Sequence, residues 1–104
     1  MSGKVLKKQM KIKILIPIYN DWKSVFKVLD EINNLNLNIK FKISVIIIND
    51  ASNHDIPDLE KNLENLDSIK VINMNINQGH TRSIAVGLKY IFEKEDFDYA
   101  IPMD

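Results

Sequence analysis

The stretch ISVIIINDAS, residues 43–52, decides the fold class. Its apolar residues run almost without interruption from Ile43 to Ile48 and give way to a polar segment that begins at Asn49. A strand that is apolar on both sides is typical of a parallel sheet whose two faces are both covered. The polar segment contains residue types that form turns and cap helices. The stretch therefore predicts a buried parallel strand that ends in a polar loop.

Apolar runs of the same kind flank this strand, and helical patterns separate them. Further strands are predicted over residues 12–18, 69–74 and 97–103, and apolar stripes at three- and four-residue steps predict helices over 22–32, 56–66 and 84–92. Asn20 or Asp21 is expected to cap the first helix, Trp22 to lie in the core, and Pro57 to occupy the first turn of the second helix. The alternation predicts an α/β fold with three layers, in which a Rossmann-like parallel sheet of about four strands has helices on both faces.

Size and charge exclude several classes of protein. The 104 residues are 45% hydrophobic and 27% charged, which suits one globular core. Fourteen basic residues balance fourteen acidic ones, so no nucleic-acid partner is expected. The chain has no cysteine, which excludes disulfides and thiolate metal sites and fits a reducing compartment. We expect a cytoplasmic location, with the cytoplasmic face of a membrane as an alternative for the complete protein.

The lysine-rich N-terminus is predicted to be separate from the folded unit. Residues 1–10 are expected to form a flexible basic leader, and residues 11–104 a single folded unit. A solvated arm is one interpretation of the leader, and contact with acidic lipid or nucleic acid is another. No apolar run approaches the roughly 20 residues that a membrane-spanning helix needs.

The most polar junctions of the chain follow the predicted strands. They are residues 19–20, 49–55, 75–82 and Asp104. In a parallel sheet the C-terminal ends of the strands lie along one edge, where ligands bind in a crevice. The sequence contains neither G-x-G-x-x-G nor G-x-x-x-x-G-K-[ST], which disfavours dinucleotide dehydrogenases and P-loop NTPases. His54 and His80 lack the companions that a zinc site needs.

Four segments at these junctions carry a family resemblance. PIYN at 17–20, INDAS at 48–52, NQGHTR at 77–82 and IPMD at 101–104 occur in the order and spacing of family 2 glycosyltransferases. Residues 11–104 resemble the nucleotide-binding half of the GT-A fold of that family. The resemblance implies a nucleotide-diphosphate sugar as donor ligand.

The resemblance also implies roles for residues near the base and ribose of that donor. Pro17, Tyr19 and Asn20 are expected beside the base and ribose. Asp50 matches an acidic residue that accepts a hydrogen bond from the base, and Ser52 belongs to the same donor-binding strand exit. A different interpretation is that Tyr19 covers the sheet edge and that Asp50 and Ser52 are ordinary turn residues.

Three further residues match positions near the diphosphate. Gly79 is expected to let the backbone approach the nucleotide, and Arg82 to contact phosphate oxygens, as guanidinium groups do. Asp104 matches the first carboxylate of the D-x-D motif, which holds ribose and a divalent cation, Mg²⁺ or Mn²⁺. Arg82 could instead be a solvated helix residue, and Gly87 is expected to be a close-packing point rather than a ligand contact.

The sequence departs from the family pattern at Asn49, where Asp is common, and at Ala51, where Gly is usual. The second carboxylate of D-x-D, the catalytic base and the acceptor-binding half are expected beyond Asp104. The resemblance thus implies a donor-binding region that is inactive alone. In the complete enzyme it would serve sugar transfer, with inversion, to a polysaccharide, lipid or protein-glycan acceptor.

Two alternatives belong to other classes. The chain could be a non-catalytic nucleotide-binding or interaction module. It could also self-associate through an exposed fourth strand, whose edge would present Tyr99, Ile101 and Met103.

Overall fold

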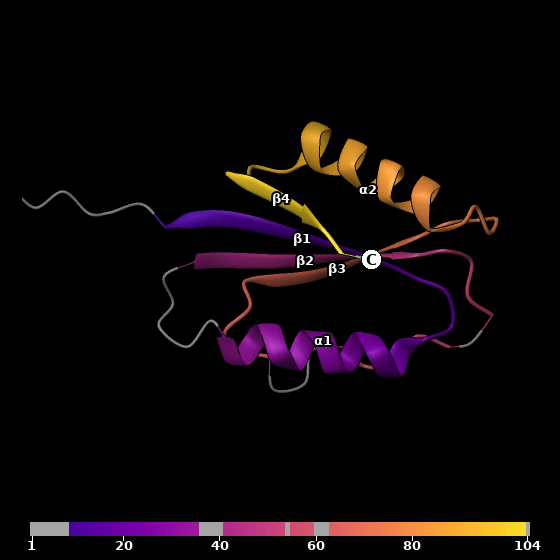
Figure 1. Cartoon of the computed structure of the whole chain (residues 1–104), viewed down its shortest axis with the longest axis horizontal. Coiled ribbons are helices and arrows are strands. Elements are labelled where there is room, and N and C mark those ends of the chain that lie inside the picture. The colour runs from indigo at the N-terminus through magenta and orange to yellow at the C-terminus, as the bar shows by residue number, and fades with distance from the viewer. Residues whose placement is uncertain (1–8, 36–40, 54, 60–62, 104) are drawn as a thin grey trace, which may run out of the picture.

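A four-stranded parallel sheet forms the middle layer of the protein. The computed structural model describes residues 9–35, 41–53, 55–59 and 63–103. The elements are β1 (Met10–Ile18), α1 (Trp22–Leu35), β2 (Phe41–Asn49), β3 (Ser68–Asn73), α2 (His80–Lys94) and β4 (Tyr99–Pro102). The strand order is β3-β2-β1-β4, and every pair of neighbours is parallel (Figure 1).

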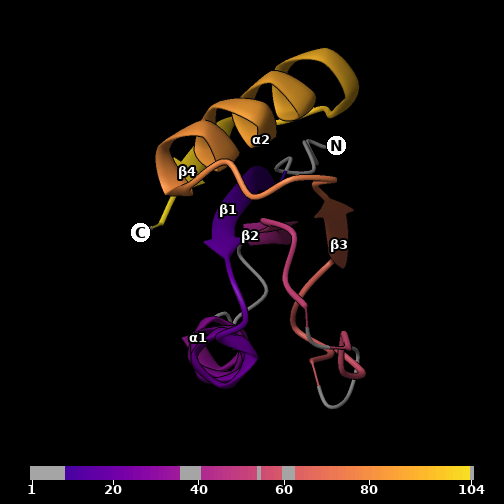
Figure 2. The ribbon, with the colours of Figure 1, turned by 90° about the vertical axis from the view of Figure 1, so that its right-hand side faces the viewer.

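The two helices lie on opposite faces of the sheet. Seen along the strands, α2 covers one face and α1 the other (Figure 2). This arrangement confirms the predicted α/β fold with three layers. The chain crosses from β1 to β2 over the α1 face and from β3 to β4 over the α2 face, so the order of the strands reverses at β1.

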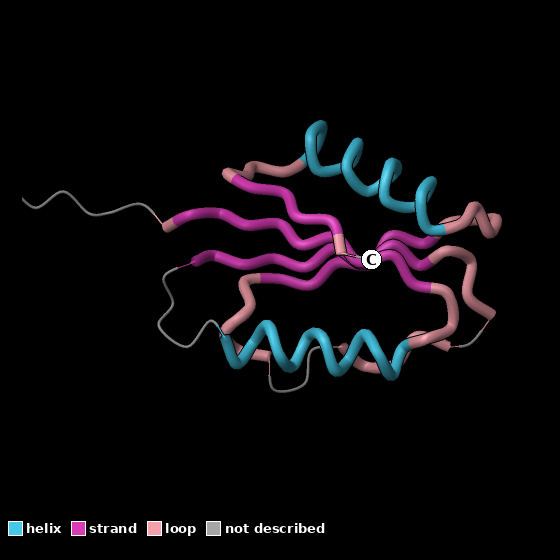
Figure 3. Tube along the Cα trace, viewed as in Figure 1, coloured by secondary structure: helices cyan, strands magenta, loops and turns pink. Residues whose placement is uncertain are grey.

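The prediction of a helix over residues 56–66 is wrong. The described residues of this segment, 56–59 and 63–66, form no helix and are drawn as loop in Figure 3. The side chain and carbonyl of Asn33 supply hydrogen bonds there, because Asn33 Oδ1 accepts from the Asn65 N–H and the Asn33 carbonyl accepts from Asn65 Nδ2, both at 2.9 Å. Leu59 and Leu66 are nevertheless buried in the core under α1. The apolar spacing predicted burial correctly but not the conformation that achieves it.

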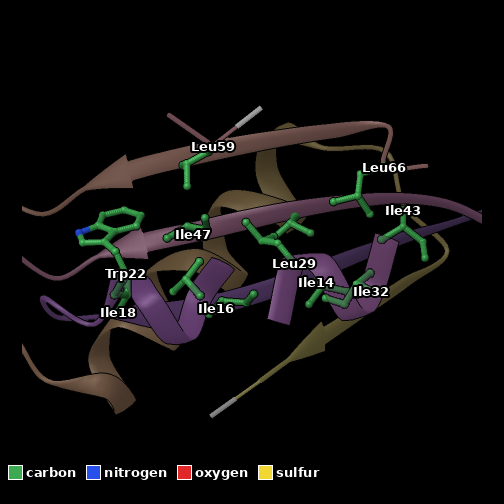
Figure 4. Packing of buried hydrophobic residues seen from close by; sticks show 12 residues of the cluster. Ile14, Ile16, Ile18, Trp22, Leu29, Ile32, Ile43, Ile47, Leu59 and Leu66 are labelled. Carbon is green, nitrogen blue, oxygen red and sulfur yellow. The ribbon is translucent and has the colours of Figure 1, made fainter. Parts of the chain in front are cut away.

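Alternating side chains of the strands divide the core in two. On the α1 face, Ile14, Ile16 and Ile18 of β1 pack with Trp22 and Leu29 of α1 (Figure 4). Trp22 is 5% exposed, which confirms that it belongs to the core. The α2 face contains a smaller buried set, consisting of Leu15, Ile46, Ile48 and Ile91. Each such side chain contributes roughly 1.5–3 kcal/mol when it is fully buried.

Local contacts fix how each helix meets the sheet. Asp21 caps α1, because its Oδ1 accepts a hydrogen bond from the Ser24 N–H at 3.3 Å. Gly87 brings α2 close to the sheet, since a Cβ atom at this position would lie 2.8 Å from Leu15 Cδ2 and 3.1 Å from Ile48 Cγ1. Gly87 is therefore a close-packing point, as predicted.

A partly buried ion-pair cluster joins the end of α2 to the sheet, and the sequence pattern gave no sign of it. Glu95 lies 3.1 Å from Lys13 of β1 and 2.6 Å from Lys70 of β3, and it accepts a hydrogen bond from the Tyr90 hydroxyl at 2.9 Å. The hydrogen bond from Lys70, supported by those from Tyr90 and Lys13, lowers the pKa of Glu95 from 4.5 to about 2. The cluster stabilises the face beneath α2.

Candidate functional site

The candidate site lies where the parallel strands end. Figure 2 views this edge directly, with the loops that leave β1, β2 and β3 in front of the sheet. Because parallel strands place all their C-terminal ends on one side, residues far apart in the sequence come together there. The predicted residues of the first three junctions share this edge.

Asp50 connects the end of β2 to the loop that precedes α2. Its side chain is 1% exposed. One carboxylate oxygen accepts a hydrogen bond from the Gln78 N–H at 2.7 Å, and the other accepts from the Gly79 N–H at 2.8 Å. The Asp50 N–H donates to the carbonyl of Ile18 at 2.8 Å. The carboxylate therefore fixes the approach to α2, and Gly79 adopts the positive φ of 87° that this turn requires.

A second set of hydrogen bonds connects the end of β1 to the loop that follows β2. The Asn20 N–H donates to Ser52 Oγ at 2.7 Å, and Asn20 Oδ1 accepts from the Asn53 N–H at 3.0 Å. Asn20 has a φ of 62°, a conformation that Asn tolerates better than most residues. Asn20 and Ser52, both predicted ligand contacts, thus hold the two strand exits together.

The two departures from the family pattern lie beside this network. Ala51 has a φ of 59°, a region in which glycine is favoured, so the backbone explains why Gly is usual there. Asn49 donates through Nδ2 to Asn73 Oδ1 at 2.9 Å and accepts through Oδ1 from the Ser52 N–H at 3.2 Å. Asn49 uses both a donor and an acceptor here, and a carboxylate could supply only the acceptor.

A cavity of about 450 Å³ opens beside the end of β1. Its apolar floor comes from β1 and α1, and its polar rim carries an acid, a hydroxyl and an imidazole. The lining residues are Ile16, Pro17, Ile18, Tyr19, Asp21, Ser24, Val25, Val28 and His80. The volume lies within the range of small-molecule sites.

Pro17 lines the cavity and belongs to the side of β1 that faces β4. β4 pairs with β1 over Ile12–Leu15, and the Leu15 carbonyl accepts from the Met103 N–H at 2.8 Å. Main-chain groups two residues apart in a strand point to the same side, so Pro17 is the next residue of β1 to face β4. Proline has no N–H to donate. Pro17 therefore cannot donate a main-chain hydrogen bond toward β4, and the crevice lies at the position where the strand order reverses.

The predicted residues occupy three kinds of position. Pro17 and Tyr19 line the cavity, and Tyr19 is 44% exposed. Asn20, Asp50, Ser52 and Gly79 form the hydrogen-bonded loops beside it. Arg82 is exposed on the first turn of α2 and is not among the residues that line the cavity. Asp104, with the predicted metal contact, lies outside the described residues.

Sequence reasoning missed three polar residues of the cavity. They are Asp21, Ser24 and His80. The sequence pattern predicts Asp21 as a helix cap and places His80 within the NQGHTR segment, but it assigns neither side chain a contact with the ligand. The position of His80 directly after Gly79, in a loop predicted to reach the ligand edge, was the signal that could have identified it.

Within the part of the chain that the structure describes, no group of three or more His, Cys, Asp or Glu side chains could hold a metal ion. These residues therefore do not by themselves fit a divalent cation. None of the described helices is long and apolar enough to cross a membrane.

Fold and site together define a Rossmann-like α/β protein with a crevice at the end of its first strand, apolar at its floor and polar at its rim. A family model, Glycosyl transferase family 2, matches residues 13–104. The chain therefore belongs to this family, and its four-stranded parallel sheet fits the Rossmann-like α/β architecture of the GT-A fold. Searches of curated proteins and of solved structures found no match to the chain.

Proposed function

We propose that the chain is the donor-binding region of a glycosyltransferase and that it binds a nucleotide-diphosphate sugar at the ends of β1 and β2. The cavity beside Pro17 and Tyr19, in a chain of family 2, is the observation that carries the proposal. The exposed part of the Tyr19 ring offers a surface on which a base or sugar can stack.

The hydrogen-bonded loops support this proposal by holding the rim in place. Asp50 fixes the loop before α2, and Asn20 with Ser52 fixes the loops after β1 and β2. A site whose loops are already ordered loses less conformational entropy when a ligand binds. In the described conformation Asp50 is a positioning residue. Its hydrogen bond to the base remains a prediction that requires the carboxylate to become accessible.

The transfer reaction is a proposal for the complete protein. An acceptor hydroxyl would attack the anomeric carbon, the nucleoside diphosphate would leave from the opposite face, and the configuration would invert. No described residue is assigned as the base that removes the hydroxyl proton or as a metal ligand, so we propose that the chain alone binds donor without transferring sugar. A cytoplasmic location, where a reducing environment suits a chain with no cysteine, belongs to the same proposal.

Calorimetric titration of the purified chain with UDP and GDP, each with and without Mn²⁺, tests the proposal. Saturable binding of either nucleotide supports it, and stronger binding with Mn²⁺ supports the predicted cation. Absence of saturable binding to both nucleotides contradicts it and favours an interaction module.

Tyr19→Ala and Tyr99→Ala provide a matched pair for this titration. Both tyrosines are exposed, at 44% and 55%, but only Tyr19 is among the residues that line the cavity. A stacked base is worth about 1–3 kcal/mol, so Tyr19→Ala should weaken binding by roughly 5- to 150-fold, whereas Tyr99→Ala should leave it unchanged. Equal effects of the two substitutions would place the nucleotide elsewhere.

A further inference from the structure

We propose that His80, rather than Arg82, is the side chain that contacts the diphosphate of the donor. This inference rests on the proposed function and deepens it. Arg82 is the cation that the family resemblance indicates for this contact. The described cavity contains His80 instead.

The geometry of α2 separates the two side chains. His80 is the first residue of α2, and Arg82 follows two positions later. Successive helical residues are rotated by about 100°, so residues two apart lie about 200° apart around the axis. The face that brings His80 to the cavity therefore directs Arg82 away from it. Both side chains are exposed, and His80 alone of the two lines the cavity.

The chemistry of the lining places an anion near His80. Among the residues that line the cavity, His80 alone can carry a positive charge, and Asp21 alone carries a negative one. Asp21 belongs to the start of α1, where one of its oxygens accepts the Ser24 N–H. A diphosphate is repelled by the Asp21 carboxylate, whereas an imidazole N–H donates to a phosphate oxygen. The Tyr19 ring and the apolar floor are then left for the uncharged part of the ligand.

Hydrogen bonds on both sides of His80 fix the position of its backbone. Asp50 holds the N–H groups of the two residues immediately before it, Gln78 and Gly79. The Ser83 N–H donates to the Gly79 carbonyl at 3.0 Å and closes the first turn of α2. The backbone that carries His80 is therefore anchored to β2 before any ligand binds, which is the condition for a directed contact.

Titration of the full chain with uridine, UMP and UDP, and with guanosine, GMP and GDP, shows whether His80 or Arg82 contacts the diphosphate. We expect His80→Gln to weaken UDP or GDP binding by roughly 10- to 150-fold, as loss of one charge-assisted hydrogen bond does, and to leave nucleoside binding within twofold of the wild type. Arg82→Gln should change none of these affinities more than twofold. His80→Lys, which keeps a positive charge, should retain the preference for the diphosphate over the nucleoside. Urea unfolding of each variant confirms that it is folded.

The outcomes distinguish this inference from the proposed function. If the wild type binds nucleotide but Arg82→Gln weakens diphosphate binding and His80→Gln does not, the inference is overturned while the proposed function stands. If His80→Gln weakens nucleoside and diphosphate equally, His80 does not contact the phosphates and the inference also fails. If the wild type binds no nucleotide, the proposed function and the inference fail together.

Discussion

Substitution of Asp50 by asparagine tests whether this carboxylate holds the site together. The two shapes are nearly identical, but asparagine offers one acceptor oxygen where aspartate offers two. One of the N–H groups of Gln78 and Gly79, now bound at 2.7 and 2.8 Å, would then face an NH₂ group. Loss of one charge-assisted hydrogen bond costs about 1.5–3 kcal/mol, and a buried unpaired N–H adds about 1–3 kcal/mol. We expect Asp50→Asn to lower the free energy of unfolding by about 3 kcal/mol.

Urea unfolding followed by far-ultraviolet circular dichroism measures this loss. A chain of this size has a free energy of unfolding of about 5–15 kcal/mol, so a change of about 3 kcal/mol is a large and measurable fraction. Asp55→Asn is the matched control, because Asp55 is an exposed acid in the same loop. It should change the free energy of unfolding by less than about 0.5 kcal/mol.

Hydrogen exchange adds a local measurement. The Gln78 and Gly79 amides should exchange faster in Asp50→Asn by more than the loss of global stability explains, because their acceptor has been altered. A cost below about 1 kcal/mol, with both amides protected as in the wild type, would refute the assignment of Asp50 as the residue that fixes this loop.

Two further substitutions test the α2 face. Gly87→Ala should lower the free energy of unfolding by about 1 kcal/mol in a urea titration. The clash of the new methyl group with Leu15 and Ile48 costs about 1–3 kcal/mol, and the better helix propensity of alanine returns up to about 1 kcal/mol. A variant more stable than the wild type would contradict the close packing. Folding lowers the pKa of Glu95 from 4.5 to about 2, so its ionised form stabilises the protein fully above about pH 4.5 and the contribution is lost as the pH falls toward 2. Between pH 5 and 2.5 the free energy of unfolding of the wild type should fall by on the order of 2 kcal/mol more than that of Glu95→Gln. This value is already reduced because Lys70 is half exposed. Curves of unfolding free energy against pH that run parallel for the two proteins would contradict the prediction.

The parts of the fold that the sequence predicts are those encoded by local patterns. The run from Ile43 to Ile48 specifies a strand buried on both faces, and the stripe that starts at Trp22 specifies a helix against it. The segment 56–66 has a similar stripe, but the hydrogen bonds between Asn33 and Asn65 join residues 32 positions apart, which no local pattern contains. Apolar periodicity reports which residues are buried and not which backbone conformation buries them.

The candidate site was predictable to the same extent. The sheet topology alone brings the first three polar junctions to one edge, so Tyr19, Asp50 and Gly79 were correctly expected near one another. The hydrogen-bond partners of these residues could not be predicted in this way. They depend on positive φ angles and on contacts between residues 28 or 29 positions apart, such as those from Asp50 to the loop before α2. The sequence therefore indicated where a ligand would bind, whereas His80 became a candidate contact only once the cavity was known.

Two prolines remove main-chain hydrogen-bond donors at the β4 side of the sheet. Pro17 removes one main-chain donor from the side of β1 that faces β4. Pro102 lies opposite Leu15, and the N–H of the next residue, Met103, donates to the Leu15 carbonyl. Main-chain groups of successive strand residues point to opposite sides, so those of Ala100 and Pro102 point away from β1, toward the outer edge of β4. Because Pro102 has no N–H, Ala100 supplies the one N–H of the four-residue strand that points outward. Short edge strands that contain proline resist pairing with a strand of another molecule. Any self-association at this edge would therefore depend on the exposed side chains of Tyr99 and Ile101 rather than on an extended sheet.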